Sequence, residues 1–366
     1  MVRTDSPSRE TVIGRAGPSN DHGTSTTPSG GVAVTDRSRA GRFRENTPGA
    51  AVEMSYAGVP SFLKSKLRDV DDVDDCDAAV LGVPYDGAVS NRPGARYGPR
   101  AVREASCWWT YLAGSKGGLT NMRTGRTVDF GEFDLVDCGD VPVFPMDETR
   151  TADSITAHVA TVAERAMPVT IGGDHYCTWP AFRGFAEGAG HDRVGFVQID
   201  AHTDTVSESP MFGTDFHGSS TQLIADSDHC DYVDVNQIGI RGYESPEFFE
   251  FAEETGLGLF PMSDVADRGI ETVVEAAIED AAAETDAVYV TLDIDAVEPG
   301  IAPGTGTPEP GGLSADQALS VMEILGRHDA VGAVDLMEVA PTHDPTGNTS
   351  QLAANLLVAF LEEQFL

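Results

Sequence analysis

Potential metal ligands alternate along one short stretch near the middle of the chain. Asp200, His202 and Asp204 follow the apolar run Val-Gly-Phe-Val-Gln-Ile at 194–199, which is typical of a buried strand. On an extended chain alternate side chains point the same way, so we expect all three to face one point. Carboxylate oxygen combined with imidazole nitrogen suits a divalent cation. This stretch therefore predicts part of a metal site.

Three more polar clusters also follow apolar runs. They are Gly-Gly-Asp-His at 172–175, Asp-Ile-Asp at 293–295, and Glu338. Ligands of open parallel sheets bind beyond the carboxyl ends of the strands, so these clusters are expected to meet there. The predicted metal ligands are His175, Asp200, His202, Asp204, Asp293 and Asp295. Glu338 is an additional carboxylate that this set does not need. Such a set is too rich for one closed zinc site and favours two divalent ions, Mn²⁺ first and Ni²⁺ or Co²⁺ as alternatives.

A pair of ions indicates a reaction type. Two divalent ions roughly 3.5–4 Å apart lower the pKa of a shared water towards about 7 and so supply hydroxide at neutral pH. Four clustered carboxylates would repel one another strongly without cations. The sequence thus points to metal-assisted hydrolysis.

The elements that must position these residues alternate between strand and helix. Strands are expected at 78–83, 169–171, 194–199, 235–240, 288–293 and 331–339. Helices are expected to begin near 98 and to span 149–166, 271–284, 314–326 and 349–365, with Ser314 and Gln317 forming a capping box. This alternation predicts an α/β fold with a largely parallel sheet. We expect residues 54–366 to form one domain.

Residues 1–53 differ from the rest of the chain. They are rich in Gly, Ser, Thr, Pro and Arg and lack apolar periodicity, so we expect a disordered tail. Met54 stands at the boundary, and one hypothesis is that translation starts there and the tail is a mis-called start. The intact mass of the native protein would contradict this hypothesis if it included residues 1–53.

The charge of the chain is extreme, at −35 from 59 acidic and 24 basic residues. The tail carries seven Arg and six acids, so residues 54–366 carry 17 basic and 53 acidic residues, a net −36. Such a surface repels nucleic acid and anionic membranes, which excludes both as expected partners. At molar salt the Debye length falls to about 3 Å and screens this self-repulsion, which favours a cytoplasmic protein of a halophile. Five widely spaced cysteines without a CxxC pair also fit a reducing compartment.

Three ordered segments resemble the ureohydrolase (arginase/agmatinase) family. They are the Gly-Gly-Asp-His at 172–175, the Asp-Ala-His-Thr-Asp at 200–204 and the Thr-Leu-Asp-Ile-Asp-Ala-Val-Glu-Pro at 291–299. Further segments with the same look lie at 56–60, 93–100, 238–242 and 302–308, so that the resemblance covers most of residues 55–366. Thr291, Ser219 and Ser220 differ from the residues usual in the family. We expect these departures to shape the substrate pocket without removing a ligand.

The resemblance implies a three-layer αβα fold, a binuclear manganese site held by the six residues named above, and bridging by two of the aspartates. It implies hydrolysis of a guanidino compound to urea and an amine. His217 matches the loop histidine that shuttles protons, and Glu338 matches the glutamate that holds the guanidinium. A carboxylate suits that task because it binds a planar cation through paired hydrogen bonds. The resemblance also suggests a homo-oligomer, trimeric or hexameric.

The substrate is expected to be a small cationic guanidino compound, agmatine first, which would yield putrescine. A guanidino acid, guanidinobutyrate or guanidinopropionate, is the second expectation, and the segment at 344–350 leans towards it. Arginase or formimidoyl hydrolase activity follows, and Thr214 disfavours arginase because that enzyme normally has Asn there. Arg92 and Arg241 are the candidates to pair with a substrate carboxylate. A non-enzymatic metal-binding protein is the last alternative, because it would need a broken ligand set.

Overall fold

A computed structural model describes residues 54–116 and 118–366, so the predicted tail at 1–53 lies outside the described residues. Nine strands of this part form one sheet in which every neighbouring pair is parallel. In spatial order they are β1 (Lys66–Leu67), β5 (Leu135–Asp140), β2 (Ala78–Gly82), β6 (Met167–Ile171), β11 (Val331–Met337), β10 (Ala287–Asp293), β7 (Val194–Ile199), β8 (Val235–Ile238) and β9 (Gly258–Phe260). A small antiparallel pair, β3 (Leu119–Thr120) and β4 (Thr127–Val128), stands apart.

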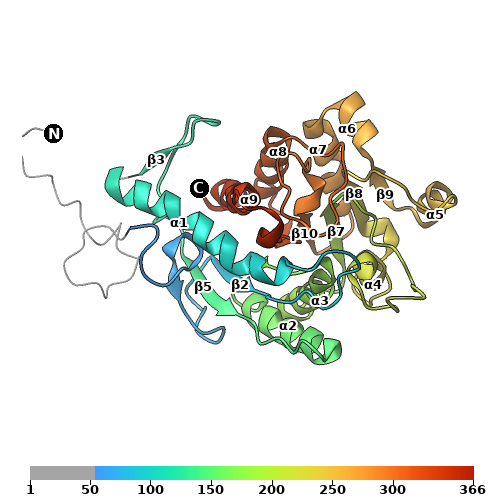
Figure 1. Cartoon of the computed structure of the whole chain (residues 1–366), viewed down its shortest axis with the longest axis horizontal. Coiled ribbons are helices and arrows are strands. Elements are labelled where there is room, and N and C mark those ends of the chain that lie inside the picture. Colours follow the sequence, from blue (N-terminus) through green and yellow to red (C-terminus); the bar gives the residue numbers. More distant parts are fainter. Residues whose placement is uncertain (1–53, 117) are drawn as a thin grey trace, which may run out of the picture. The chain divides into compact units, whose positions relative to one another are not determined.

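Helices cover both faces of the sheet (Figure 1). One face packs on α1 (Gly98–Lys116), α7 (Ile270–Ala281), α8 (Ala315–Gly326) and α9 (Asn348–Phe365). The other packs on α2 (Glu148–Ala163) and α3 (Thr178–Ala189). Shorter helices, α4 (Ser220–Ala225), α5 (Phe248–Thr255) and α6 (Met262–Arg268), follow β7, β8 and β9. The expected three-layer αβα fold with a parallel sheet is therefore confirmed.

The two-sided covering explains why the strands are apolar without a break. Along β10, Val288, Val290 and Leu292 join one core, whereas Tyr289 joins the other. The Tyr289 ring there contacts Phe182 of α3, with ring centroids 5.7 Å apart. A strand buried on both faces has no polar side, so its sequence does not alternate.

The strand order decides where the chemistry gathers. The chain visits β6, β7, β10 and β11 in that order, but in the sheet they lie side by side as β6-β11-β10-β7. All four run parallel, so their carboxyl ends open at the same edge. These are the four strands that precede the polar clusters, so topology alone brings those clusters together.

The helix α3 was not predicted, because Pro180, Gly184 and Gly188 weaken its helical pattern. The packing explains both glycines. A Cβ at Gly184 would lie 2.6 Å from the backbone oxygen of Thr156, and one at Gly188 would lie 2.2 Å from that of Ala160. The glycines thus permit the close crossing of α3 over α2. The predicted helices and strands otherwise agree within three residues at each end, and Ser314 and Gln317 do form the capping box.

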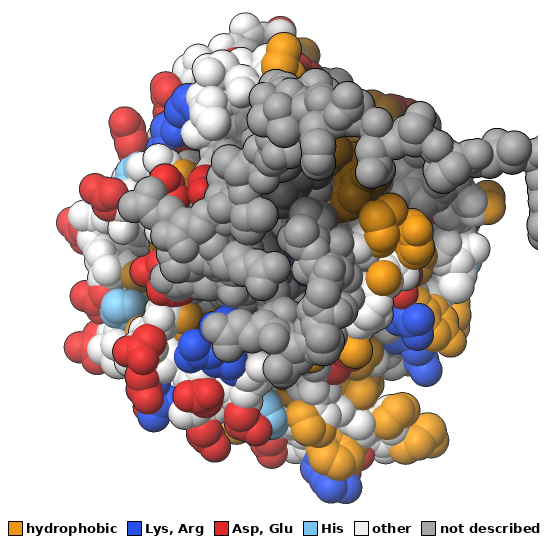
Figure 2. Space-filling model, turned by 90° about the vertical axis from the view of Figure 1, so that its left-hand side faces the viewer, with side chains coloured by type: hydrophobic (Ala, Val, Ile, Leu, Met, Phe, Trp, Pro, Cys, Tyr) orange, Lys and Arg blue, Asp and Glu red, His pale blue; other side chains and the backbone are white. Residues whose placement is uncertain are grey.

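In Figure 2, Asp and Glu side chains are spread over the left of the described surface, whereas hydrophobic side chains gather on the right. Within residues 54–116 and 118–366, no helix has the length and apolarity that a membrane crossing requires.

Candidate metal centre

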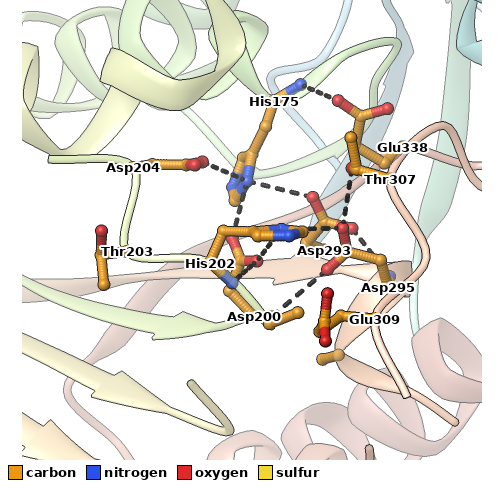
Figure 3. Close-up of polar contacts among 12 residues, drawn as sticks. His175, Asp200, His202, Thr203, Asp204, Asp293, Asp295, Thr307, Glu309 and Glu338 are labelled. Carbon is orange, nitrogen blue, oxygen red and sulfur yellow. Dashed lines mark hydrogen bonds and ion pairs between the residues drawn. The ribbon is translucent and has the colours of Figure 1, made fainter. Parts of the chain in front are cut away.

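His175 lies at the centre of one group of ligands (Figure 3). Its Nδ1 is 2.9 Å from Asp200 Oδ2, 3.0 Å from Asp204 Oδ2 and 3.2 Å from Asp293 Oδ2. The imidazole is 1% exposed, yet this nitrogen makes a well-directed hydrogen bond to none of the three carboxylates. Such convergence of one lone-pair nitrogen and three carboxylates suits a bound cation.

A second group adjoins the first and shares a residue with it. Asp200, His202 and Asp295 offer ligand atoms that all lie within 4.8 Å of one another, as do His175, Asp200 and Asp293. His202 Nδ1 is 3.1 Å from Asp295 Oδ2 and 3.7 Å from Asp200 Oδ1. Because Asp200 belongs to both groups, the arrangement could hold two ions with Asp200 between them. All six predicted ligands are brought together.

The reason expected for this convergence was wrong. We predicted that an extended chain would point Asp200, His202 and Asp204 the same way, but β7 ends at Ile199. Asp200 Oδ1 instead accepts a 2.7 Å hydrogen bond from the backbone nitrogen of His202, and Asp204 has a left-handed φ of 50°. A compact turn, held by the first aspartate, therefore aims the ligands.

The second aspartate pair uses the same device. Asp293 Oδ1 accepts a 2.8 Å hydrogen bond from the backbone nitrogen of Asp295. In both turns one oxygen of the first aspartate holds the backbone and the other, Oδ2, faces His175. Each Asp-x-ligand motif is thus a self-supporting loop at the end of a buried strand.

Four of the ligands are held from behind by polar side chains. Gln198 Nε2 donates to Asp200 Oδ2 at 2.7 Å, Ser220 Oγ donates to Asp204 Oδ2 at 3.2 Å, and Thr307 Oγ1 donates to Asp295 Oδ2 at 3.1 Å. His175 Nε2 lies 2.9 Å from Thr291 Oγ1. Ser220 and Thr291 were noted in the sequence only as departures from the family, whereas both contact ligands directly.

The hydroxyl of Thr291 also interacts with the buried carboxylate of Asp335. Asp335 of β11 is fully buried and accepts a 2.8 Å hydrogen bond from the hydroxyl of Tyr289. Burial, opposed by the charge of His175 and by hydrogen bonding from Thr291, raises the pKa of Asp335 to about 6. Sequence reasoning missed this residue, because an acid at an alternate strand position is not distinguishable from an exposed one.

The electrostatics of the cluster reflect an excess of buried negative charge. Burial and the neighbouring charges of Asp204 and Asp295 raise the pKa of Asp200 to about 6. Burial opposes protonation of His202, but Asp295 and then Asp200 raise its pKa to about 11. The raised pKa of His202 shows that the aspartates favour positive charge at this position, and a divalent cation would supply that charge.

His217 and Glu338, the two predicted catalytic residues, contact each other. His217 Nδ1 is 2.8 Å from Glu338 Oε1, and the ring of His217 is almost fully buried. Burial opposes protonation of the His217 ring, but the hydrogen bond and charge of Glu338 raise the pKa of His217 to about 9. The other ring nitrogen, Nε2, lies 2.6 Å from Ser90 Oγ, a contact that sequence reasoning also missed.

Glu338 offers one oxygen that has no partner. Its Oε1 accepts from His217 and also from the backbone nitrogen of His175 at 3.1 Å, but its Oε2 is buried without a hydrogen bond. The residue also has a left-handed φ of 61°, directly after β11. Backbone strain and an unsatisfied buried carboxylate oxygen in one residue are typical of a ligand-binding position.

Arg92 and Arg241, the candidates to pair with a substrate carboxylate, both serve the backbone. Arg92 donates to the carbonyl oxygens of Thr305 and Gly306 at 2.9 Å and 3.2 Å. Arg241 donates to the carbonyls of Glu309 and Asp295 at 2.7 Å and 2.6 Å, and to those of Gly239 and Ala296. Their guanidinium groups hold the rim of the site together.

The protein comparisons agree with this geometry. Residues 76–362 match the arginase family. The chain belongs to the arginase family. This arginase-family chain is 35% identical to the proclavaminate amidinohydrolase of Streptomyces clavuligerus over 83% of this chain and 93% of the relative. It is also 35% identical to the mitochondrial agmatinase of Gallus gallus (88% and 90% covered) and to the guanidinopropionase of Pseudomonas aeruginosa (84% and 92% covered).

Solved structures show the same fold. The solved structure of the proclavaminate amidinohydrolase from Streptomyces clavuligerus superposes with a TM-score of 0.73 at 32% identity, covering 86% of this chain and 99% of that one. The resemblance noted in the sequence is therefore confirmed, and with it the expectation that this arginase-family protein is a hydrolase of the ureohydrolase type.

Proposed function

We propose that this protein is a binuclear manganese hydrolase that cleaves agmatine to urea and putrescine. The observation that carries the proposal is the shared Asp200, which joins two ligand groups beside a buried glutamate with a free oxygen. The ligands would be His175, Asp200, Asp204 and Asp293 around one ion and Asp200, His202 and Asp295 around the other. When bound, such a pair activates water for attack on a carbon centre.

The remaining chemistry belongs to the side chains of the chain itself. Glu338 Oε2 is free to accept N–H groups of the guanidinium, which has the planar donor geometry that a carboxylate matches. His217, beside Glu338, would supply the proton that the departing amine needs. The positive charge of a bound guanidinium would offset the charge of Glu338, lower the pKa of His217, and so ease release of that proton.

The charges at the rim support an amine tail rather than a carboxylate tail. Arg92 and Arg241 already donate to backbone carbonyls, as described above. Glu309 lies beside the ligand cluster in Figure 3, and Arg241 ties its backbone to that of Asp295. Its carboxyl carbon would be 3.0 Å from a Cβ at Gly242, so the side chain packs against that glycine. A carboxylate beside the site attracts the ammonium of agmatine and repels the carboxylate of a guanidino acid.

The sequence of the segment at 344–350 favoured a guanidino acid as the substrate, but in the structure this segment has a structural role. Asp344 accepts from the backbone nitrogens of Thr346 and Thr349 at 2.9 Å and 2.7 Å, immediately before and at the start of α9. Thr349 Oγ1 in turn accepts from the backbone nitrogen of Gly304 at 2.8 Å. These contacts fix the turn rather than present a cation to substrate.

The proposal is tested by urea release from the Mn²⁺-loaded protein at molar salt. The panel comprises agmatine, arginine, guanidinobutyrate, guanidinopropionate, guanidinoacetate and guanidine. We expect agmatine to have the highest kcat/KM, about tenfold or more above each guanidino acid, because one favourable charge contact is worth about 1.4 kcal/mol at an exposed rim. A faster guanidino acid would contradict the substrate, and silence on the whole panel with metal bound would contradict the ureohydrolase activity.

An isosteric substitution that removes the charge of Glu309 sharpens that comparison. Glu309→Gln should lower kcat/KM for agmatine while leaving guanidine, which has no tail, unchanged. Glu362→Gln is the matched control, since Glu362 lies on α9 and pairs with Arg126 instead.

The hydroxyl of Thr291 gives a separate prediction about the metal. A histidine that binds metal through one nitrogen usually donates the other N–H to a fixed acceptor, and losing that acceptor costs about 10–100-fold in metal affinity. We therefore expect Thr291→Val to weaken Mn²⁺ binding by about that factor, because His175 Nε2 would be buried without a partner. Titration of metal-free protein with Mn²⁺, followed by the signal of free Mn²⁺ in electron paramagnetic resonance, measures it. Thr170→Val on the adjoining part of the sheet is the control, and equal affinities in both variants would refute the role.

The proposal extends to conditions and assembly. The −36 charge of residues 54–366 supports a halophilic, cytoplasmic enzyme that needs high salt. A trimer or hexamer, and a place in polyamine synthesis, are carried over from the family resemblance.

A further inference from the structure

His217 has hydrogen-bond partners on both ring nitrogens. Nδ1 meets Glu338 Oε1 at 2.8 Å, and Nε2 meets both the hydroxyl of Ser90 at 2.6 Å and the backbone nitrogen of Ser90 at 3.1 Å. The backbone nitrogen of His217 also donates to the carbonyl of Ala88 at 3.1 Å. The imidazole is therefore placed by the segment around Ser90, far away in the sequence.

The chemistry of these partners selects one tautomer. The backbone N–H of Ser90 can only donate, so it requires a lone pair on Nε2. The neutral ring then carries its proton on Nδ1, where Glu338 accepts it. The Ser90 hydroxyl can donate to the Nε2 lone pair, and it can accept from Nε2–H when the ring is charged. The hydroxyl of Ser90 therefore suits Nε2 in both protonation states of the ring, whereas its backbone N–H suits only the neutral ring.

The loop that carries Ser90 is anchored on both sides of it. On one side the backbone nitrogen of Ala88 donates to buried Asp174 Oδ2 at 2.8 Å. On the other, Asn91 Nδ2 donates to Gly306 O at 3.1 Å, and Arg92 donates to the neighbouring carbonyls as described above. Ser90 itself is partly exposed, whereas His217 is 7% exposed. A serine held this firmly can impose an orientation on the ring.

We propose that Ser90 is a positioning residue for His217, which holds the ring so that its Nδ1 proton faces Glu338 and the substrate. This inference rests on the proposed ureohydrolase function. Ser90 does not touch the reacting atoms and acts through the histidine. A charged ring that gives its Nδ1 proton to the departing amine is left neutral with its remaining proton on Nε2, where the Ser90 hydroxyl can accept it.

The test compares Ser90→Ala with Ser90→Thr in the Mn²⁺-loaded, full-length protein. Alanine keeps the backbone donor and removes the hydroxyl, whereas threonine keeps both. We expect Ser90→Ala to lower kcat for agmatine about tenfold, the effect of one lost hydrogen bond. KM should stay unchanged, and the alkaline limb of the kcat/KM profile should move to lower pH because the charged ring loses its acceptor. Ser90→Thr should restore both. Wild-type kcat and pH profile in Ser90→Ala, or equal losses in both variants, would overturn the proposal.

A double-mutant cycle separates action through His217 from any other effect. In a His217→Ala background, adding Ser90→Ala should cause no further loss, because the group that Ser90 positions is gone. A further tenfold loss in the double variant would overturn the proposal.

A measurement without substrate keeps this inference distinct from the proposed function. Long-range ¹⁵N–¹H correlation spectra of histidine-labelled protein, with diamagnetic Mg²⁺ in place of Mn²⁺, report the tautomer of His217 directly. Burial opposes protonation of the ring, but Glu338 raises the pKa of His217 to about 9, so the neutral ring is observed above that pH, and we expect it to be Nδ1-protonated in the wild type. Ser90→Ala should keep this tautomer through the backbone donor but reach the neutral form at lower pH, even if no guanidino compound is hydrolysed. An Nε2-protonated ring in the wild type would refute the role of Ser90.

Discussion

Replacing Asp200 by asparagine is expected to abolish Mn²⁺-dependent urea release and the stabilisation that Mn²⁺ confers. Asp200 is the only residue common to both ligand groups that the described part of the chain contains, and it is fully buried. Removing one charge from a buried set of paired charges costs about 3–5 kcal/mol, on the order of 10³-fold in affinity. Both ions would be weakened by one change.

The fold should survive this substitution. Asparagine Oδ1 can still accept from the backbone nitrogen of His202, which holds the turn at 2.7 Å in the wild type. One negative charge fewer also reduces repulsion among the carboxylates. We therefore expect the metal-free variant to melt no lower than the metal-free wild type.

Differential scanning calorimetry with and without Mn²⁺ measures both effects. A ligand at 1,000 times its Kd stabilises a protein by about 4.1 kcal/mol, so the wild-type Tm should rise clearly with saturating Mn²⁺. Asp200→Asn should show no rise. The control is Asp234→Asn, a buried aspartate that pairs with Arg193 just before β8, at the opposite edge of the sheet. Its metal-induced rise should match the wild type, and a full rise in Asp200→Asn would refute the shared ligand.

The second large effect is expected from Glu338→Gln. The glutamine Oε1 can keep the contacts with His217 and the backbone of His175, while an NH₂ group takes the place of the unpartnered Oε2. That NH₂ group would face the N–H donors of a guanidinium. Losing a buried charge pair costs about 2–5 kcal/mol, so kcat/KM for agmatine should fall by about 30- to 4,000-fold. Mn²⁺ affinity should remain unchanged.

The pH dependence gives Glu338→Gln a second signature. Glu338 is the main group that raises the pKa of His217, to about 9, against the opposing effect of burial. If His217 must be protonated, wild-type kcat/KM is fully expressed below that pKa and is lost as the pH rises through about 9. With a neutral residue at 338 the pKa of His217 falls, so the alkaline limb should move to lower pH.

Glu362→Gln serves again as the control for a buried glutamate, now for both readouts. It should retain the wild-type kcat/KM and the wild-type alkaline limb. An unchanged limb in Glu338→Gln, together with unchanged kcat/KM, would show that neither guanidinium binding nor the proton of His217 depends on Glu338.

Much of the site could be predicted because its signals are local. His175, Asp200, Asp293 and Glu338 each follow an apolar strand, and strands buried on both faces have a recognisable composition. The types of side chain then limit the metal chemistry. The predicted ligands converge for the same reason, since four strands that run parallel end at one edge of the sheet.

The tertiary structure alone decided how the ligands converge and what supports them. The order β6-β11-β10-β7 is not the order of the chain, and it arises from pairing between strands far apart in sequence. The turn at Asp200 replaces the extended geometry that alternation suggested. Ser90 reaches His217 across 127 positions, and no local pattern marks such a contact. Arg92 and Arg241 illustrate the same limit: a free guanidinium and one that binds backbone carbonyls look alike in a sequence.

The sequence by itself therefore determined the four strands that precede the polar clusters, the side chains predicted to bind metal and the family to which the chain belongs, because these depend on residue type and short spacing. The tertiary structure decided the shared position of Asp200, the pairing of His217 with Glu338 and Ser90, and the place of Glu309 beside the ligand cluster. These depend on contacts between distant loops, whose partners are set only when the whole sheet has assembled.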